Sequence, residues 1–299
     1  MYVILGASGN TGHIVATHLL AAKQKVRVVG RNAAHLQPLT AKGAETFIGD
    51  VTDAQALTKA FHQADAAYVM IPPDPASKDP LGYSNRVSDA IASAVQKSGI
   101  KNVVALSSVG AEQSSGVGPV VGLHHLEQKL NQIQSANVLS LRAGYFMENT
   151  LPQANAIRQM GVVAGPLRPD LKIPMIATRD IGAAAASALV KPNFHGKQTR
   201  ELLGQRDLTY TEVAGIIGDA IAKPDLKYVQ VPDDQFLSIA VQMGMSDQFA
   251  RLLLEMTNSL NSGHMHALEP RSPQNSTPTS YEAFVAESFV PAYQHQAAA

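Results

Sequence analysis

The first twelve residues, MYVILGASGNTG (1–12), decide how the rest of the chain is organised. Tyr2 to Leu5 form a short apolar run, and Gly6, Gly9 and Gly12 follow it with no spacer. This order predicts a strand, a tight turn and the start of a helix. The N-terminus of a helix offers unpaired N–H groups and a positive dipole end, which suit a pyrophosphate when no side chains block its approach.

The three glycines of this turn have separate expected roles. Gly6 would allow the turn, Gly9 a close approach of backbone to phosphate, and Gly12 close packing of the helix on the strand. Glycine triplets also serve ordinary turns, but here a second apolar run at 26–29 completes a βαβ unit of about thirty residues. We therefore expect dinucleotide binding, with contacts from Gly6, Ser8, Gly9, Asn10, Thr11 and Gly12.

Composition limits the classes of function. The 299 residues are 45% hydrophobic, enough for a packed core in one large or two modest domains, and 24 Lys and Arg balance 24 Asp and Glu. No global charge therefore recruits nucleic acid or anionic lipid. The chain has no cysteine, and His264 and His266 stand apart from carboxylates, so no metal site is expected. Without a secretory leader or a long apolar span, we expect a cytoplasmic protein that does not enter the membrane.

Two strand ends offer side chains for the adenosine half of the cofactor. An acidic residue after the second strand binds the ribose hydroxyl in NAD-selective folds, whereas an arginine accommodates a phosphate there. Arg31 at this place predicts a preference for NADP(H) with NAD(H) as a second cofactor, although it can also be a solvated loop arginine. Asp50, after the third strand, can meet the adenine edge or simply cap a turn. Val51 is assigned to the same site.

The chain continues with strands and helices in alternation, which indicates a parallel sheet covered on both faces. Apolar runs predict strands over 66–71, 102–106 and 138–142, and a helix over 84–98. Ile71, Ser107 and Ser108 then lie at the carboxyl ends of strands, where open α/β sheets bind ligands. The polar loop 74–82 either covers a bound nicotinamide or is an ordinary surface loop.

Together these motifs resemble the NmrA-like branch of the atypical short-chain dehydrogenases/reductases. The likeness rests on the glycine turn, Arg31, Gly49-Asp50-Val51, Leu106-Ser107-Ser108, and the blocks LRAGYFMEN (141–149), TRDIG (178–182) and LTYTEVA (208–214). The resemblance implies either an NAD(P)H-dependent quinone reductase or an NADP-sensing regulator. It also implies that Tyr145, Phe146 and Asn149 lie along the nicotinamide, although the two aromatic residues can equally belong to the core.

One departure from the family pattern concerns the catalytic pair. The main family uses a tyrosine with a lysine four positions later, and no tyrosine of this chain has a lysine at that offset. His125 and Lys129 are four apart on a predicted helix and share a face. By resemblance, Lys129 would contact the nicotinamide ribose, and His125 occupies the slot of the missing tyrosine. The catalytic candidates are therefore Lys129, His125 and Tyr145, with a solvated lysine and a partly exposed histidine as the alternatives.

We expect an α/β fold, a Rossmann-type doubly wound parallel sheet with a smaller, mostly helical C-terminal region. Residues 1–149 would bind NAD(P), residues 176–204 would return to the same sheet, and residues 150–299 would bind the substrate. The methionine-rich helices over 235–260 are typical of a core, and the alternative is an adaptable pocket for a flat apolar ligand.

Two functions fit this organisation. The first is an NADPH-dependent oxidoreductase that transfers a hydride to a small electrophile such as a quinone. The second is a non-catalytic NADP(H)-sensing regulator that binds a protein partner. Nucleic acid is expected as a partner only if the protein is such a regulator. The retained His125 and Lys129 favour the enzyme, and the missing tyrosine favours the sensor. Either function is compatible with an oligomer.

Overall fold

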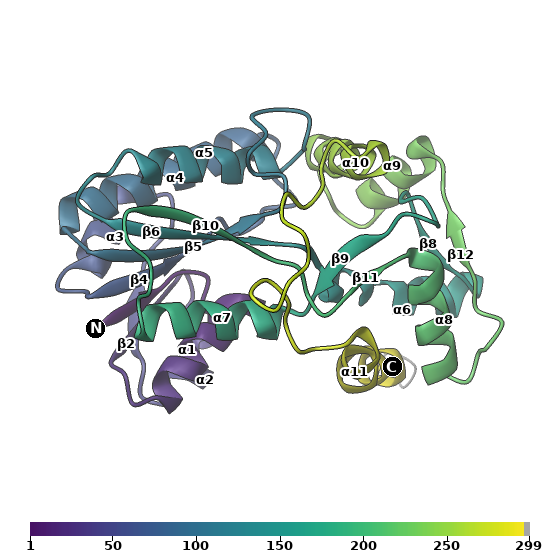
Figure 1. The fold of residues 1–299 in the computed structure, drawn as a ribbon, viewed down its shortest axis with the longest axis horizontal. Coiled ribbons are helices and arrows are strands. Elements are labelled where there is room, and N and C mark those ends of the chain that lie inside the picture. The colour runs from purple at the N-terminus through teal and green to yellow at the C-terminus, as the bar shows by residue number, and fades with distance from the viewer. Residues whose placement is uncertain (296–299) are drawn as a thin grey trace.

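The computed structural model describes residues 1–295; residues 296–299, the end of the expected substrate region, lie outside the described part. A seven-stranded sheet with the order β10-β6-β5-β4-β1-β2-β3 forms its centre (Figure 1). Every pairing in this sheet is parallel. Its strands are β1 (Tyr2–Ile4), β2 (Val26–Gly30), β3 (Glu45–Ile48), β4 (Ala66–Val69), β5 (Asn102–Ser108), β6 (Asn137–Ala143) and β10 (Lys197–Leu202). The order confirms a doubly wound Rossmann-type sheet, whose strand order reverses between β1 and β4.

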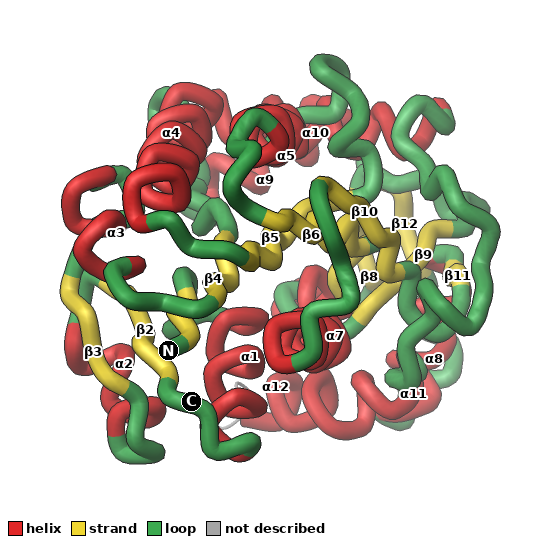
Figure 2. The backbone as a smooth tube through the Cα atoms, turned by 60° about the vertical axis from the view of Figure 1, so that its left-hand side comes forward, coloured by secondary structure: helices red, strands yellow, loops and turns green. Residues whose placement is uncertain are grey.

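Helices cover both faces of this sheet (Figure 2). One face carries α1 (Asn10–Ala21), α2 (Ala33–Thr40) and α7 (Thr178–Val190), and the other carries α3 (Ala54–Phe61), α4 (Pro80–Ser98) and α5 (Val120–Asn131). Successive strand residues enter opposite cores: Ile4 and Val28 pack with α1, and Val3 and Val29 pack with α3 and α4. Burial on both faces explains why these strands are continuous apolar runs.

Helix α4 begins one turn earlier than the sequence analysis expects. The Asp79 carboxylate accepts a hydrogen bond from the Gly82 N–H at 3.0 Å, and Pro80 occupies the first helical position. The preceding loop is therefore shorter than 74–82. Ser246 fixes it, because the Ser246 hydroxyl donates to the Ser77 carbonyl at 2.5 Å and the Ser246 N–H donates to the Pro75 carbonyl at 2.8 Å.

The C-terminal region builds a second core beside the carboxyl ends of the strands. It contains β7 (Tyr145–Phe146), a 3₁₀ turn (Met147–Thr150), α6 (Gln153–Met160), β8 (Val163–Gly165), β9 (Ile173–Ile176), β11 (Asp207–Leu208), α8 (Tyr210–Ala220), β12 (Tyr228–Gln230), α9 (Asp233–Gln242), α10 (Asp247–Ser262), α11 (Tyr281–Phe284), a π-helical turn (Val285–Phe289) and α12 (Val290–His295). Strands β11, β9 and β7 form one small sheet, and β12 and β8 another. The region is mostly helical, as expected.

A segment that we call the strap, residues 263–280, joins α10 to α11 past the carboxyl end of β10 (Figure 1). The Glu201 carboxylate of β10 accepts the N–H groups of Leu268 and Glu269, each at 2.9 Å. Near the other end, the Asp180 carboxylate of α7 accepts the N–H and the hydroxyl of Thr279 at 3.0 and 2.7 Å. Two carboxylates of the Rossmann part thus hold the strap.

Within residues 1–295, no helix combines the length and the apolar character that crossing a bilayer requires.

Candidate functional site

The glycine turn between β1 and α1 leaves the start of the helix open. Gly6 has a positive φ of 64°, and a Cβ on Gly12 would lie 2.3 Å from the Gly6 carbonyl oxygen. Both positions therefore require glycine for the fold itself. A Cβ on Gly9 would meet nothing closer than 3.4 Å, so the fold does not demand glycine there. A ligand that approaches this backbone would explain the choice.

The first helical turn keeps its N–H groups available. Gly9 is the N-cap without a side-chain hydrogen bond, and the turn has no acidic residue. The first bond of the helix runs from the His13 N–H to the Gly9 carbonyl at 3.1 Å. The N–H groups of residues 10–12 have no hydrogen-bond partner within the described chain. Three converging donors at a positive dipole end fit a pyrophosphate.

The polar side chains of this turn differ in their surroundings. Ser8 and Asn10 are exposed next to Gly9, whereas Thr11 is buried. The Tyr68 hydroxyl donates a hydrogen bond to the Thr11 hydroxyl at 2.9 Å, which ties the start of α1 to β4. The Thr11 side chain therefore serves the fold, and its backbone N–H is the group left for a cofactor.

At the adenosine end, Arg31 and Asp50 lie near each other. The hydroxyl and the N–H of Thr52 donate to the Asp50 carboxylate at 2.7 and 2.8 Å, and these bonds are the main reason for its lowered pKa. Arg31 lowers the same pKa to a smaller extent. Asp50 thus stabilises its own turn, while Asp53 caps α3. The adenine contact of Asp50 stays a prediction, as does the role of Val51, which packs in the core on the α3–α4 side.

A cavity of about 640 Å³ lies between the carboxyl ends of the strands and the C-terminal region. Six of the expected site residues line it: Ile71, Ser107, Ser108, Tyr145, Phe146 and Asn149. Met70 lines the same cavity and reaches the glycine turn, because a Cβ on Gly6 would lie 2.6 Å from its Sδ. The cavity therefore begins beside the turn and has the volume of a typical small-molecule site.

Helix α10 supplies an apolar wall of this cavity. Phe249, Leu252, Met256 and Leu260 repeat at helical spacing and all line it, and Met265 follows from the strap. The methionine-rich helices thus contribute to a pocket as well as to packing. Met side chains adapt to flat ligands of different outline.

His125 and Lys129 do not reach this cavity. His125 Nδ1 lies 2.6 Å from Asn85 Oδ1, and Lys129 forms an ion pair with Asp89. Both partners are on α4, one turn apart, so this polar face of α5 meets α4. Val120 and Leu123 are the α5 residues that line the cavity instead. The geometry therefore gives no support to proton donation by His125 or to a ribose contact by Lys129.

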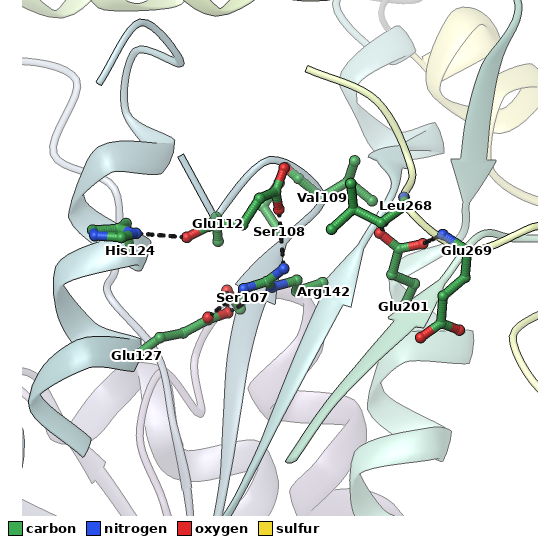
Figure 3. Close-up of polar contacts among 11 residues, drawn as sticks. Ser107, Ser108, Val109, Glu112, His124, Glu127, Arg142, Glu201, Leu268 and Glu269 are labelled. Atoms are coloured by element: carbon green, nitrogen blue, oxygen red, sulfur yellow. Dashed lines mark hydrogen bonds and ion pairs between the residues drawn. The ribbon is translucent and has the colours of Figure 1, made fainter. Parts of the chain in front are cut away.

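A buried ionic network holds the strand ends beneath Ser108 (Figure 3). Arg142 contacts Glu127 at 2.7 and 3.1 Å and Glu112 at 3.0 Å, and the Ser107 hydroxyl donates to Glu127 at 2.5 Å. Burial disfavours the Arg142 charge, but the two carboxylates raise its pKa overall. Ser107 is thus engaged in the network, and Ser108 is the serine whose side chain stays outside it, donating to the Val109 carbonyl at 2.8 Å.

Tyr145 has a partner that the sequence analysis did not identify. Its hydroxyl oxygen lies 3.1 Å from that of Tyr210, and the two rings meet edge to face with centroids 6.2 Å apart. Burial raises the pKa of Tyr145, and hydrogen bonding with Tyr210 and Asn149 acts in the opposite direction. Tyr210 belongs to the block 208–214, but no local signal connects it to a residue 65 positions earlier.

Comparison with known proteins finds a matching family and a related enzyme. The model of the NmrA-like family matches residues 2–284. An NAD(P)H azoreductase of Xenophilus azovorans is 30% identical over 258 residues, which cover 86% of each protein.

Two solved structures share the fold. The NADPH-dependent quinone oxidoreductase of Escherichia coli, complexed with NADPH, superposes with a TM-score of 0.80 at 24% identity, over 97% of this chain and 100% of that one. The triphenylmethane reductase of Citrobacter sp., complexed with NADP(H), superposes with a TM-score of 0.82 at 18% identity, over 96% of this chain and 100% of that one.

Proposed function

This chain belongs to the NmrA-like family, and on that premise we propose that it is an NADPH-dependent reductase of small, flat, apolar acceptors such as quinones or azo compounds. The cavity is the observation that carries this proposal. It begins beside the open start of α1, at Met70, and ends at the apolar wall of α10. Such a space would hold a hydride donor and an acceptor side by side.

The cofactor half of the site follows from the turn and the strand ends. The N–H groups of residues 10–12 would hold the pyrophosphate, and Arg31 the 2′-phosphate. The Arg31 side chain is exposed and makes no hydrogen bond or ion pair within residues 1–295, so it is free to bind a phosphate. Ser108, Phe146 and Asn149 would then border the nicotinamide, which supplies the hydride when bound. NADP(H) is the preferred cofactor and NAD(H) the second.

The acceptor half is mainly apolar. The relatives described above are named for the reduction of azo compounds, quinones and triphenylmethane dyes. Quinones and azo compounds are flat and conjugated, and the α10 side chains offer them a surface without charge. We infer that this wall selects the acceptor by shape and apolar contact.

A non-catalytic NADP(H) sensor is the other function that the sequence allows. No structural observation favours it over the reductase, because cofactor sensing does not require a space for an acceptor. Tight NADPH binding without oxidation by any quinone or azo dye would overturn the reductase and leave the sensor.

The direct test is whether the purified protein oxidises NADPH in the presence of menadione or methyl red. The loss of nicotinamide absorbance measures this oxidation. We expect turnover with at least one acceptor. Leu252→Asp places a charge in the apolar wall, and we expect KM for the acceptor to rise about tenfold or more, since burying an unpaired carboxylate costs over about 1.4 kcal/mol. The Kd of NADPH should stay within about twofold.

Leu254→Asp is the matched control. Leu254 lies on the same helix but borders a separate shallow groove and not the cavity. We expect this variant to keep the wild-type KM. Equal effects of the two substitutions would contradict the assignment of α10 as the acceptor wall.

A further inference from the structure

We propose that Tyr210 is a positioning residue that directs the proton of Tyr145 toward the acceptor, which makes Tyr145 the proton donor of the reaction. This inference rests on the proposed reductase function and names a residue for which neither the sequence motifs nor the relatives give a role.

Tyr210 is held firmly behind the cavity. It is the first residue of α8, and its neighbour Thr209 is the N-cap in a reciprocal capping box with Glu212. Its side chain is buried, with 4% of the residue exposed. The ring packs on Tyr228 at 4.9 Å and edge to face on Tyr145 at 6.2 Å. These contacts fix the hydroxyl against Tyr145.

The direction of the hydrogen bond follows from counting partners. Within residues 1–295, the Tyr210 hydroxyl has one hydrogen-bond partner, the Tyr145 hydroxyl at 3.1 Å. If Tyr145 were the donor, the Tyr210 proton would be buried without an acceptor, which costs about 1 to 3 kcal/mol. Tyr210 therefore donates to Tyr145. A phenol has a single proton, so Tyr145 keeps its own for another acceptor.

The place of Tyr145 decides where that proton goes. Tyr145 lies in β7 and lines the cavity together with Ser108, Phe146 and Asn149. Its oxygen receives the bond from Tyr210 and interacts with Asn149. Tyr210 does not use the Tyr145 proton, and Tyr145 lines the cavity, so this proton is available to an acceptor bound there.

The chemistry needs one proton from such a group. After a hydride from NADPH has reduced the acceptor by two electrons, an acceptor oxygen or nitrogen carries negative charge. The Tyr145 O–H bond breaks, a new O–H or N–H bond forms on the acceptor, and the electron pair stays on the Tyr145 oxygen. The hydrogen bond from Tyr210 stabilises this tyrosinate. Water then returns a proton to Tyr145, and the overall reaction balances with NADP⁺ as the oxidised product.

Two further tyrosines, Tyr228 and Tyr281, face this pair. Lys172 and Asp207 line the same cavity as Tyr145. The Tyr228 hydroxyl donates to the Leu167 carbonyl at 2.7 Å, and the Tyr281 hydroxyl donates to Thr150 at 2.9 Å. Tyr228→Phe is therefore a matched control, because it removes the hydroxyl of a half-buried tyrosine that packs on Tyr210 and is not bonded to Tyr145.

The kinetic test compares four variants with NADPH and menadione. Tyr145→Phe should lower kcat about a hundredfold, the usual contribution of a general acid. Tyr210→Phe should lower kcat about tenfold with little change in KM, as for one hydrogen bond to a charged group. The double variant should match Tyr145→Phe alone, because Tyr210 acts through Tyr145. Tyr228→Phe should keep the wild-type kcat.

A second readout needs neither cofactor nor acceptor. The NMR signal of the hydroxyl-bearing ring carbon of Tyr145, assigned from its loss in Tyr145→Phe, follows ionisation. Because the bond from Tyr210 stabilises the tyrosinate, Tyr210→Phe should raise the Tyr145 pKa, so that titration begins at a higher pH than in the wild type. Tyr228→Phe should leave the titration unchanged.

The outcomes separate the two proposals. If the wild type turns over and Tyr210→Phe behaves as Tyr228→Phe does in both assays, the inference is overturned while the reductase stands. If the losses of the two single variants add in the double variant, the inference is also overturned. If no acceptor oxidises NADPH, the proposed function fails, and an unshifted Tyr145 titration would then reject the Tyr210 bond as well.

Discussion

At the scale of single residues, Arg31 is the side chain expected to choose between the two nicotinamide dinucleotides. It follows β2, is exposed, and would place its charge against a 2′-phosphate that NADH lacks. We expect Arg31→Ala to weaken NADPH binding by about tenfold or more, the loss of a hydrogen bond to a charged group, with little effect on NADH. Calorimetric titration with both cofactors measures the ratio.

Arg251→Ala is the comparison variant for this experiment. Arg251 is also an exposed arginine, but it lies on α10, pairs with Asp247 at 2.7 Å and does not line the cavity. We expect it to leave the ratio of the two dissociation constants unchanged. An equal ratio in wild type and Arg31→Ala would refute the phosphate contact.

The roles of some single residues could not be predicted from the sequence. Spacing predicted that His125 and Lys129 share a helix face, and they do, but spacing does not say which neighbour that face meets. Here it meets Asn85 and Asp89 of α4. Tyr145 was a candidate from its block, whereas its partner Tyr210 becomes visible once β7 and α8 are packed together. Contacts between distant segments decide these roles.

At the scale of elements, alanine substitutions of a glycine in α1 and of a glycine in α8 should have opposite effects on stability. A Cβ on Gly12 would lie 2.3 Å from a backbone oxygen, so Gly12→Ala must displace the turn. We expect a loss of about 1 to 3 kcal/mol of unfolding free energy, as for overpacking. NADPH affinity should fall with it, because the displaced turn carries the pyrophosphate donors. Urea unfolding and NADPH titration measure the two effects.

Gly215→Ala is the contrasting substitution. Gly215 lies inside α8, and its added Cβ would meet nothing within 4 Å. Alanine in a helix interior should therefore stabilise the protein by up to about 1 kcal/mol without changing NADPH affinity. If Gly215→Ala destabilised the protein, or if Gly12→Ala left its stability unchanged, the space around each glycine would not explain the effect of the added methyl group.

Helices and strands were predicted better than single-residue roles, because the sequence signals for helices and strands are local. The strand and turn at 2–12 and the apolar runs of β4, β5 and β6 need no distant partner to be recognised. The early start of α4 was missed although Asp79-Pro80 is a local capping signal. The direction of a helix face is different, since it depends on which helix packs beside it.

At the scale of the whole molecule, the cavity was the least predictable feature. Its walls come from the strand ends, α5, α10 and the strap, and α10 begins more than a hundred residues after β5 and α5. Residues 269–280 are rich in Pro, Ser and Thr, a composition typical of a surface connection, yet Glu269, Pro270 and Arg271 line the cavity. Composition describes solvent preference, but it does not reveal which two cores a connection joins.

The strap should therefore control how firmly those two cores are held together. Asp180 lies in α7 of the Rossmann core, and Thr279 leads into α11 of the second core. Asp180→Ala leaves the buried N–H and hydroxyl of Thr279 without an acceptor, so we expect a loss of about 2 to 3 kcal/mol of unfolding free energy. Hydrogen exchange should also accelerate across 263–280.

The control is Asp247→Ala, which removes an exposed i,i+4 ion pair with Arg251. This variant should lose at most about 0.5 kcal/mol of unfolding free energy and leave hydrogen exchange in the strap unchanged. If both variants lost the same stability, the two cores would be joined by apolar packing and not by this bond.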